Sequence, residues 1–173
     1  MKKILFVIGY NRNNIYRRMN LELLISLASN PENEVYILDC NGQIKGYCWC
    51  GKDKANKKRC SKCFDTWKDL AREYKIPQKH FLKMKSVKCP EIPRFKTMKE
   101  AINYEIDGYN VGVGPVSTVI TMTRDYNFDL EKYHEYVASG METCYITLKN
   151  IERLNQEYNF DELYIFNGRF HLN

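Results

Sequence analysis

The sequence of 173 residues contains no apolar run of about 18 residues, the length that a membrane-spanning helix requires. Residues 1–9 open with two lysines, but the apolar run behind them is too short for a secretory signal peptide. Internal repeats and low-complexity segments are also missing. With 44% hydrophobic residues, the chain is expected to be a globular protein of the cytoplasm.

Recognisable catalytic motifs are absent as well. The three histidines show neither metal-ligand nor triad spacing, and no nucleophile has an evident base partner. The glycines of residues 108–114 precede an expected helix, where backbone amides could hold an anion. Their order differs from both the dinucleotide fingerprint and the Walker loop. The residues themselves therefore assign no catalytic group.

Alternating strand and helix patterns are present, and they predict an α/β fold. Residues 2–9 form an apolar, β-favouring run that ends at a glycine, which is typical of a strand buried on both faces of a parallel sheet. A helical pattern over 15–27 and a second apolar strand over 34–40 complete a βαβ unit. Further helices are expected over 97–107, 115–124 and 129–158, and a last strand over 161–167. We predict a single Rossmann-like domain over 1–173, with a parallel sheet flanked by helices.

Basic residues concentrate in the middle of the chain. Residues 41–100 hold 17 lysines and arginines against 6 acidic residues, whereas the remainder holds 10 against 15. We interpret 41–95 as a basic, cysteine-rich insertion after the second strand. Such a stretch suits anionic lipid headgroups, nucleic acid or a phosphorylated ligand, although it could also be a solvated surface that keeps the insertion soluble.

Six of the seven cysteines lie between residues 40 and 89. Cys60 and Cys63 have the spacing of a metal knuckle, in which two thiolates turn around one tetrahedral ion. Cys40 and Cys48 could complete a four-sulfur structural zinc site, with Cys50 as the alternative to Cys48. Free or redox-active thiols and an iron–sulfur cluster are the other interpretations of the same spacing.

Polar residues follow the ends of the expected strands, where ligands of open parallel sheets bind. Residues 9–12 follow the first strand, Asp39 ends the second, and Asn167, Gly168 and Arg169 follow the last. A guanidinium on a glycine-bearing loop can grip a phosphate or a carboxylate through two hydrogen bonds. A ligand cleft is therefore predicted there. Its candidate residues are Asn11, Arg12, Ser117, Arg124, Asn167, Gly168 and Arg169.

The order of these features resembles the amino-terminal region of bacterial surface-polysaccharide (capsule-type) biosynthesis proteins related to two-domain glycosyltransferases. The resemblance is carried by the cysteines 40, 48, 60 and 63, by the helix "GVGPVSTVITMTR", and by "FNGR" at residues 166–169. It covers the whole chain, and the extra Cys50 and the lysine-rich insertion depart from it.

The resemblance implies an acceptor-side domain, the amino-terminal half of a longer protein that continues past residue 173. A missing carboxyl-terminal domain would bind the sugar nucleotide donor, so this chain alone is expected to be inactive. The acceptor would be a glycan or a lipid-linked acceptor, and the basic insertion would lie against the inner membrane face. The alternative function is a zinc-stabilised nucleic-acid-binding module that uses the basic region and its aromatic residues.

Overall fold

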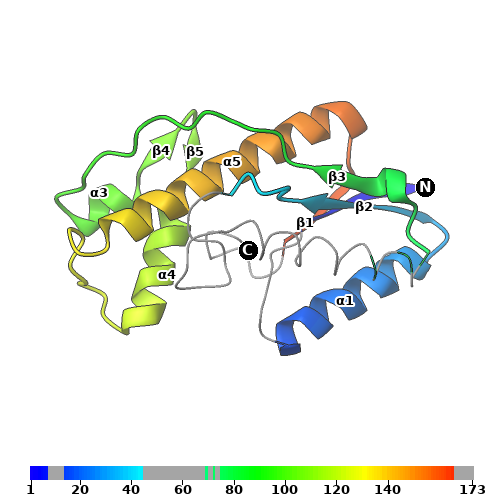
Figure 1. Cartoon of the computed structure of the whole chain (residues 1–173), viewed down its shortest axis with the longest axis horizontal. Helices are drawn as coiled ribbons and strands as arrows, with labels where there is room; N and C mark the ends of the chain where they lie inside the picture. The colour runs from blue at the N-terminus through cyan, green and yellow to red at the C-terminus, as the bar shows by residue number, and fades with distance from the viewer. Residues whose placement is uncertain (8–13, 45–68, 70–71, 73–74, 166–173) are drawn as a thin grey trace.

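A computed structural model describes residues 1–7, 14–44, 69, 72 and 75–165. Its centre is a four-stranded parallel sheet in the order β3-β2-β1-β6 (Figure 1). The strands are β1 (Lys2–Val7), β2 (Asn33–Asp39), β3 (Phe81–Lys83) and β6 (Glu162–Ile165). The predicted α/β class, with a parallel sheet flanked by helices, is confirmed.

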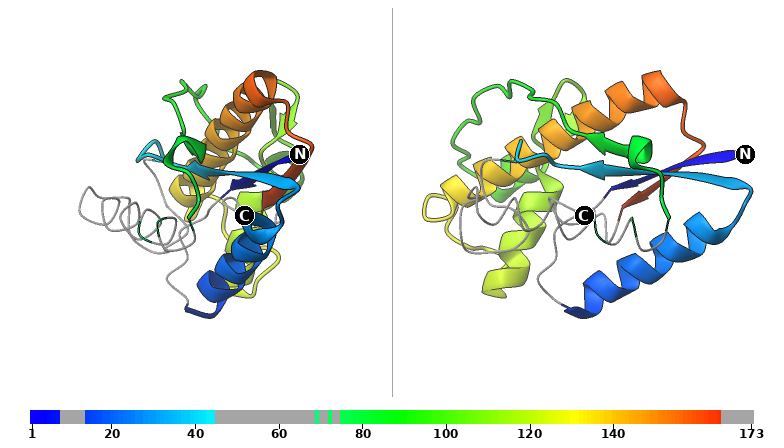
Figure 2. Two further views of the ribbon diagram at one scale, coloured as in Figure 1. Left: turned by 90° about the vertical axis from the view of Figure 1, so that its right-hand side faces the viewer. Right: turned by 45° about the vertical axis from the view of Figure 1, so that its right-hand side comes forward.

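Two helices cover opposite faces of this sheet (Figure 2). They are α1 (Asn14–Ser29) and α5 (His134–Tyr158). The apolar run of β1 serves both faces because successive strand side chains point in opposite directions. Ile4 and Phe6 pack with Leu24 of α1, whereas Leu5 and Val7 pack in the cluster that includes two buried residues of α5. The near-continuous hydrophobicity of β1 and β2 follows from this burial on both sides.

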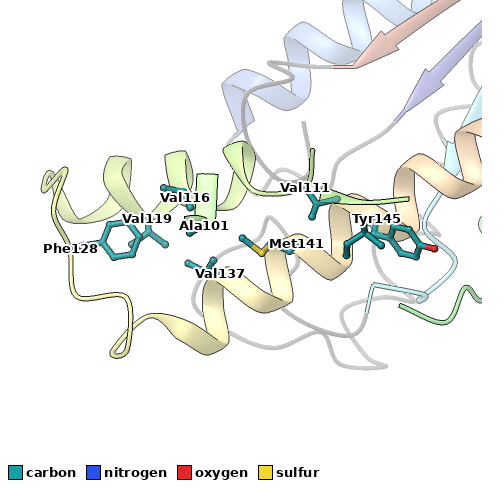
Figure 3. Packing of buried hydrophobic residues seen from close by; sticks show 9 residues of the cluster. Ala101, Val111, Val116, Val119, Phe128, Val137, Met141 and Tyr145 are labelled. Carbon is teal, nitrogen blue, oxygen red and sulfur yellow. The ribbon is translucent and has the colours of Figure 1, made fainter. Parts of the chain in front are cut away.

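A second core lies beside the amino-terminal half of α5 (Figure 3). It is formed with α3 (Met98–Ile102), α4 (Val113–Thr123) and the hairpin β4 (Glu105–Ile106) and β5 (Tyr109–Asn110). Val119, Val137 and Met141 are at most 1% exposed within it. One long helix therefore joins the sheet to a smaller helical layer. No helix in the described part of the chain is both long and apolar enough to cross a membrane.

The helix expected over 97–107 is shorter in the structure. α3 ends at Ile102, and the chain then turns through Asp107 and Gly108, whose φ angles are 52° and 80°. An Asp-Gly pair at positive φ is the preferred turn of a two-residue hairpin, so β4 and β5 pair instead of extending the helix.

The helix expected from Asp129 also begins later, at His134. The Asp129 carboxylate accepts hydrogen bonds from the backbone N–H groups of Glu131 and Lys132, at 2.9 and 3.1 Å. The prediction that Asp129 caps this helix is therefore wrong, because its side chain closes a turn ahead of the helix, whose N-cap is Tyr133.

The range 41–95, interpreted as an insertion, includes one strand of the main sheet. β3 pairs in parallel with β2, with Leu82 opposite Leu38. It follows a short 3-10 helix, η1 (Gln78–His80). Most of the cysteine-rich part of this range lies outside the described residues.

Candidate functional site

The strand order has a topological switch point between β1 and β6. From β1 the chain winds to β2 and β3 on one side, and it later returns to place β6 on the other side of β1. Val7 and Ile165, the last residues of β1 and β6, are opposite each other in the parallel register. Ligands of open α/β sheets bind at such a point, beyond the carboxyl ends of the strands.

Five of the predicted site residues lie on the two segments that follow these strand ends. Asn11 and Arg12 follow β1, and Asn167, Gly168 and Arg169 follow β6, all of them outside the described residues.

Asp39 ends β2 at this same edge of the sheet. Its backbone oxygen accepts a hydrogen bond from Met84 N at 2.9 Å, and it is opposite Lys83 in the register with β3. Burial raises the pKa of the Asp39 carboxyl above its ordinary value, and the backbone amide of Asn41 and the Lys83 ammonium oppose this increase. Because β3 was not foreseen from the sequence, Lys83 was missed as a neighbour of Asp39.

Ser117 and Arg124, the two other predicted site residues, belong to α4, which lies beyond the carboxyl ends of the strands (Figure 1). Ser117 is half-buried and its backbone oxygen accepts a hydrogen bond from the Thr121 hydroxyl at 2.9 Å. Arg124 is exposed and forms the carboxyl-terminal cap of the helix, with φ of 58°.

The amino terminus of α4 is already capped by a side chain. Asn110 Oδ1 accepts hydrogen bonds from the backbone N–H groups of Gly112 and Val113, at 3.1 and 3.2 Å. These amides are therefore occupied, which argues against the glycine-bearing segment as an anion cradle. Gly112 serves packing, because a Cβ there would lie 1.9 Å from the carbonyl oxygen of Ala101.

Cys40 is the one predicted zinc ligand within the described residues. It directly follows Asp39 at the carboxyl edge and is partly buried against the core on the α5 face of the sheet. Cys48, Cys50, Cys60 and Cys63 fall outside the described residues. Within the described ranges, no group of three or more histidine, cysteine or acidic side chains could hold a metal ion.

A cavity of about 320 Å³ lies at the opposite, amino edge of the sheet. The His80 ring lines it, with Nδ1 donating to the Val35 carbonyl oxygen at 3.1 Å and Nε2 at 3.3 Å from Glu34 Oε1. The ring also stacks on Tyr36, with centroids 4.5 Å apart. These contacts join η1 to β2, so we assign His80 a structural role.

A second cavity, of about 370 Å³, lies between α5 and β6. Its lining is mostly apolar and includes Leu148, Ile151 and Leu163. Two acidic groups at this cavity pair with lysines of the same chain, Glu152 with Lys149 at 2.6 Å and Glu162 with Lys2. The cavity therefore offers little unsatisfied polarity to a ligand.

The chain was compared with protein-family models, curated proteins and solved structures. No protein-family model matches the chain, and neither the curated proteins nor the solved structures contain a significant match to it.

Proposed function

We propose that this chain is the acceptor-side domain of a glycosyltransferase-like protein in surface-polysaccharide biosynthesis. One observation carries the proposal: β1 and β6 are parallel neighbours whose carboxyl ends coincide at Val7 and Ile165. The two polar segments that the resemblance associates with ligand binding thus start side by side. This arrangement supports a cleft at the carboxyl edge of a Rossmann-like sheet.

The chemistry would be the transfer of a sugar from an activated nucleotide to a glycan or lipid-linked acceptor. This chain would hold and orient the acceptor, and a domain outside it would bind the donor. Arg12 and Arg169 would grip an acceptor phosphate, since a guanidinium matches two phosphate oxygens at once. No described residue is proposed as the group that transfers the sugar.

A structural zinc ion would attach the basic segment to the end of β2. Cys40 fits this role by position, because it is the first residue after the strand and is partly buried. Four thiolates would leave no coordination position for a catalytic water. The ion would therefore order the segment near the cleft and would not take part in the reaction.

The acceptor role predicts that the chain binds glycans through Arg169. We expect oligosaccharide phosphates from bacterial surface polysaccharide to bind the wild-type chain, and Arg169→Ala to weaken binding about tenfold or more. Isothermal titration calorimetry measures both affinities. Arg94→Ala, which removes an exposed ion pair with Glu131, is the matched control. Equal affinities for the wild type and Arg169→Ala would remove the proposed role of this arginine.

The basic segment supports a second candidate function, binding to nucleic acid. Residues 41–100 hold 17 basic against 6 acidic residues, and Trp49 and Trp67 within them could stack on bases. This function predicts affinity for single-stranded RNA or DNA that falls steeply as salt rises. Vesicles of anionic lipid serve as the comparison, because the glycosyltransferase proposal places the same segment against the inner membrane face. Binding to vesicles but not to nucleic acid would eliminate the alternative.

A further inference from the structure

The Asp39 carboxylate stands out among the described side chains at the carboxyl edge. Its Oδ2 atom is buried and has no hydrogen-bond partner in the described part of the chain. Strand alternation places Asp39 on the same face as Val35 and Ile37, which pack in one cluster with Leu24 of α1. The unpartnered oxygen therefore lies at the edge of an apolar layer.

A buried oxygen without a hydrogen-bond partner lowers the stability of the folded protein. Leaving a buried polar group without a partner costs about 1–3 kcal/mol, and more for a charged group. Elsewhere the buried Asn150 amide makes three hydrogen bonds to backbone groups, and the exposed Asp161 Oδ2 accepts one from Lys3 N at 2.7 Å. Asp39 Oδ2 is one of four such buried, unpartnered side-chain atoms among the described residues, with His80 Nε2, Thr147 Oγ1 and Arg153 Nε. Of these four, only Asp39 ends a strand at the carboxyl edge, where ligands of parallel sheets bind.

We propose that Asp39 Oδ2 accepts a hydrogen bond from a hydroxyl group of the glycan acceptor, an inference that rests on the proposed function. A carboxylate is an acceptor only, so its natural partner is an O–H or N–H group. The same negative charge repels phosphate. The neutral sugar ring, and not the phosphate of an acceptor, therefore sits at the end of β2.

The position of Asp39 in the sheet determines the direction in which a bound acceptor would lie along the carboxyl edge. β2 is next to β1, and β1 is next to β6, so Asp39 is one strand away from the switch point at the ends of β1 and β6. Neighbouring strands are about 4.8 Å apart, close to the width of one sugar ring. An acceptor bound across the edge would thus present successive groups to the ends of β6, β1 and β2.

The first test measures stability without a ligand. We expect Asp39→Leu to raise the midpoint of thermal unfolding, because the cost of burying the carboxylate outweighs the hydrogen bonds that it accepts from the backbone amides of Asn41 and Cys40. Asp161→Leu is the matched control and should lower the midpoint, since it removes the partner of Lys3 N. If Asp39→Leu also lowers the midpoint, Asp39 is structural and the inference fails.

The second test measures binding, with neutral oligosaccharides released from bacterial surface polysaccharide and with inorganic pyrophosphate as probes. We expect Asp39→Asn to weaken oligosaccharide binding at least tenfold and to leave pyrophosphate binding unchanged. If the wild type and Asp39→Asn bind oligosaccharide equally, the inference fails while the proposed function stands. If the wild type binds no oligosaccharide, the proposed function fails and the inference fails with it.

Discussion

Asn150 lies on α5 and joins that helix to the chain just after β3. Its Oδ1 accepts from Lys85 N at 2.8 Å, and its amide nitrogen donates to the carbonyl oxygens of Lys85 and Ile146 at 3.1 and 2.9 Å. The residue is only 1% exposed. The Asn150 side chain thus pairs with both backbone groups of Lys85, as a neighbouring strand would. These two hydrogen bonds hold the chain after β3 against α5.

Replacing Asn150 by alanine should destabilise the protein strongly. The change leaves the partly buried N–H and C=O groups of Lys85 without partners, and we expect a loss of about 2–4 kcal/mol in the free energy of unfolding. Urea denaturation measures it. Gln156→Ala, at an exposed position of the same helix, is the control and should change the free energy by less than about 0.5 kcal/mol. A similar small change for Asn150→Ala would contradict the assigned role.

His80 should make stability depend on pH. Burial lowers the pKa of its imidazole below the ordinary value of 6.5, despite the opposing attraction of Glu34. The unfolded chain therefore binds this proton more readily than the folded one, so stability present above pH 6.5 is lost as the pH falls.

Urea titrations at several pH values, compared between the wild type and His80→Gln, isolate this contribution. The variant should lose less stability than the wild type when the solution is acidified from about pH 7 to pH 5. Identical pH dependence in the two proteins would show that His80 does not titrate differently on folding.

At the scale of elements, two glycines near α4 illustrate different requirements. Gly112 has an ordinary φ of −82°, but an added Cβ would meet the backbone oxygens of Ala101 and Ile102 at 1.9 and 2.7 Å. Gly108 has open space around it but a φ of 80°. The first glycine permits the close packing of α3 on α4, and the second permits the hairpin turn.

Alanine substitutions should separate these two requirements. Gly108→Ala should cost about 1–2 kcal/mol, because an L-residue is strained at positive φ. Gly112→Ala should cost more than about 3 kcal/mol, because two helices must move apart to accept the methyl group. Thermal and urea unfolding of both variants measure the two losses in the free energy of unfolding. A larger loss for Gly108→Ala than for Gly112→Ala would contradict the prediction.

Local patterns predicted some elements well and others poorly, for identifiable reasons. β1, β2, α4 and β6 were located because each combines a strong apolar pattern with a clear glycine, proline or polar boundary. β3 was missed because it has three residues and sits among lysines, and its identity depends on pairing with β2. The Asp107–Gly108 pair is a turn signal in the sequence, and the prediction of a helix over 97–107 did not take it into account.

At the scale of the whole molecule, the sheet topology determines where a ligand site can be. The strand order and the register at Val7 and Ile165 bring together residues separated by most of the chain. From the sequence alone, the rule for parallel sheets selects Asp39 and the two polar segments as candidates, and their role in binding stays a prediction. The unpartnered state of Asp39 Oδ2 could not be foreseen, because it depends on burial against neighbouring elements.

The cysteine-rich segment should carry one zinc ion per chain. Four thiolates suffice for a structural site, so Cys60→Ser with Cys63→Ser should abolish stoichiometric zinc. Elemental analysis of the purified chain measures the content. Cys144→Ser, on α5 and far along the chain from the cluster, should retain the wild-type amount. A wild-type chain without zinc, or a double variant with unchanged zinc, would contradict the site.

The most direct test of the central claim is to map where a glycan binds. Backbone amide resonances of the labelled chain would be followed by NMR during titration with surface-polysaccharide oligosaccharides. A ligand at the carboxyl edge predicts the largest shifts at residues 39–43 and 83–85, with little change at the amino edge around Glu34 and His80. Shifts centred on Glu34 and His80, or no shifts at all, would contradict the assignment of the carboxyl edge as the functional site.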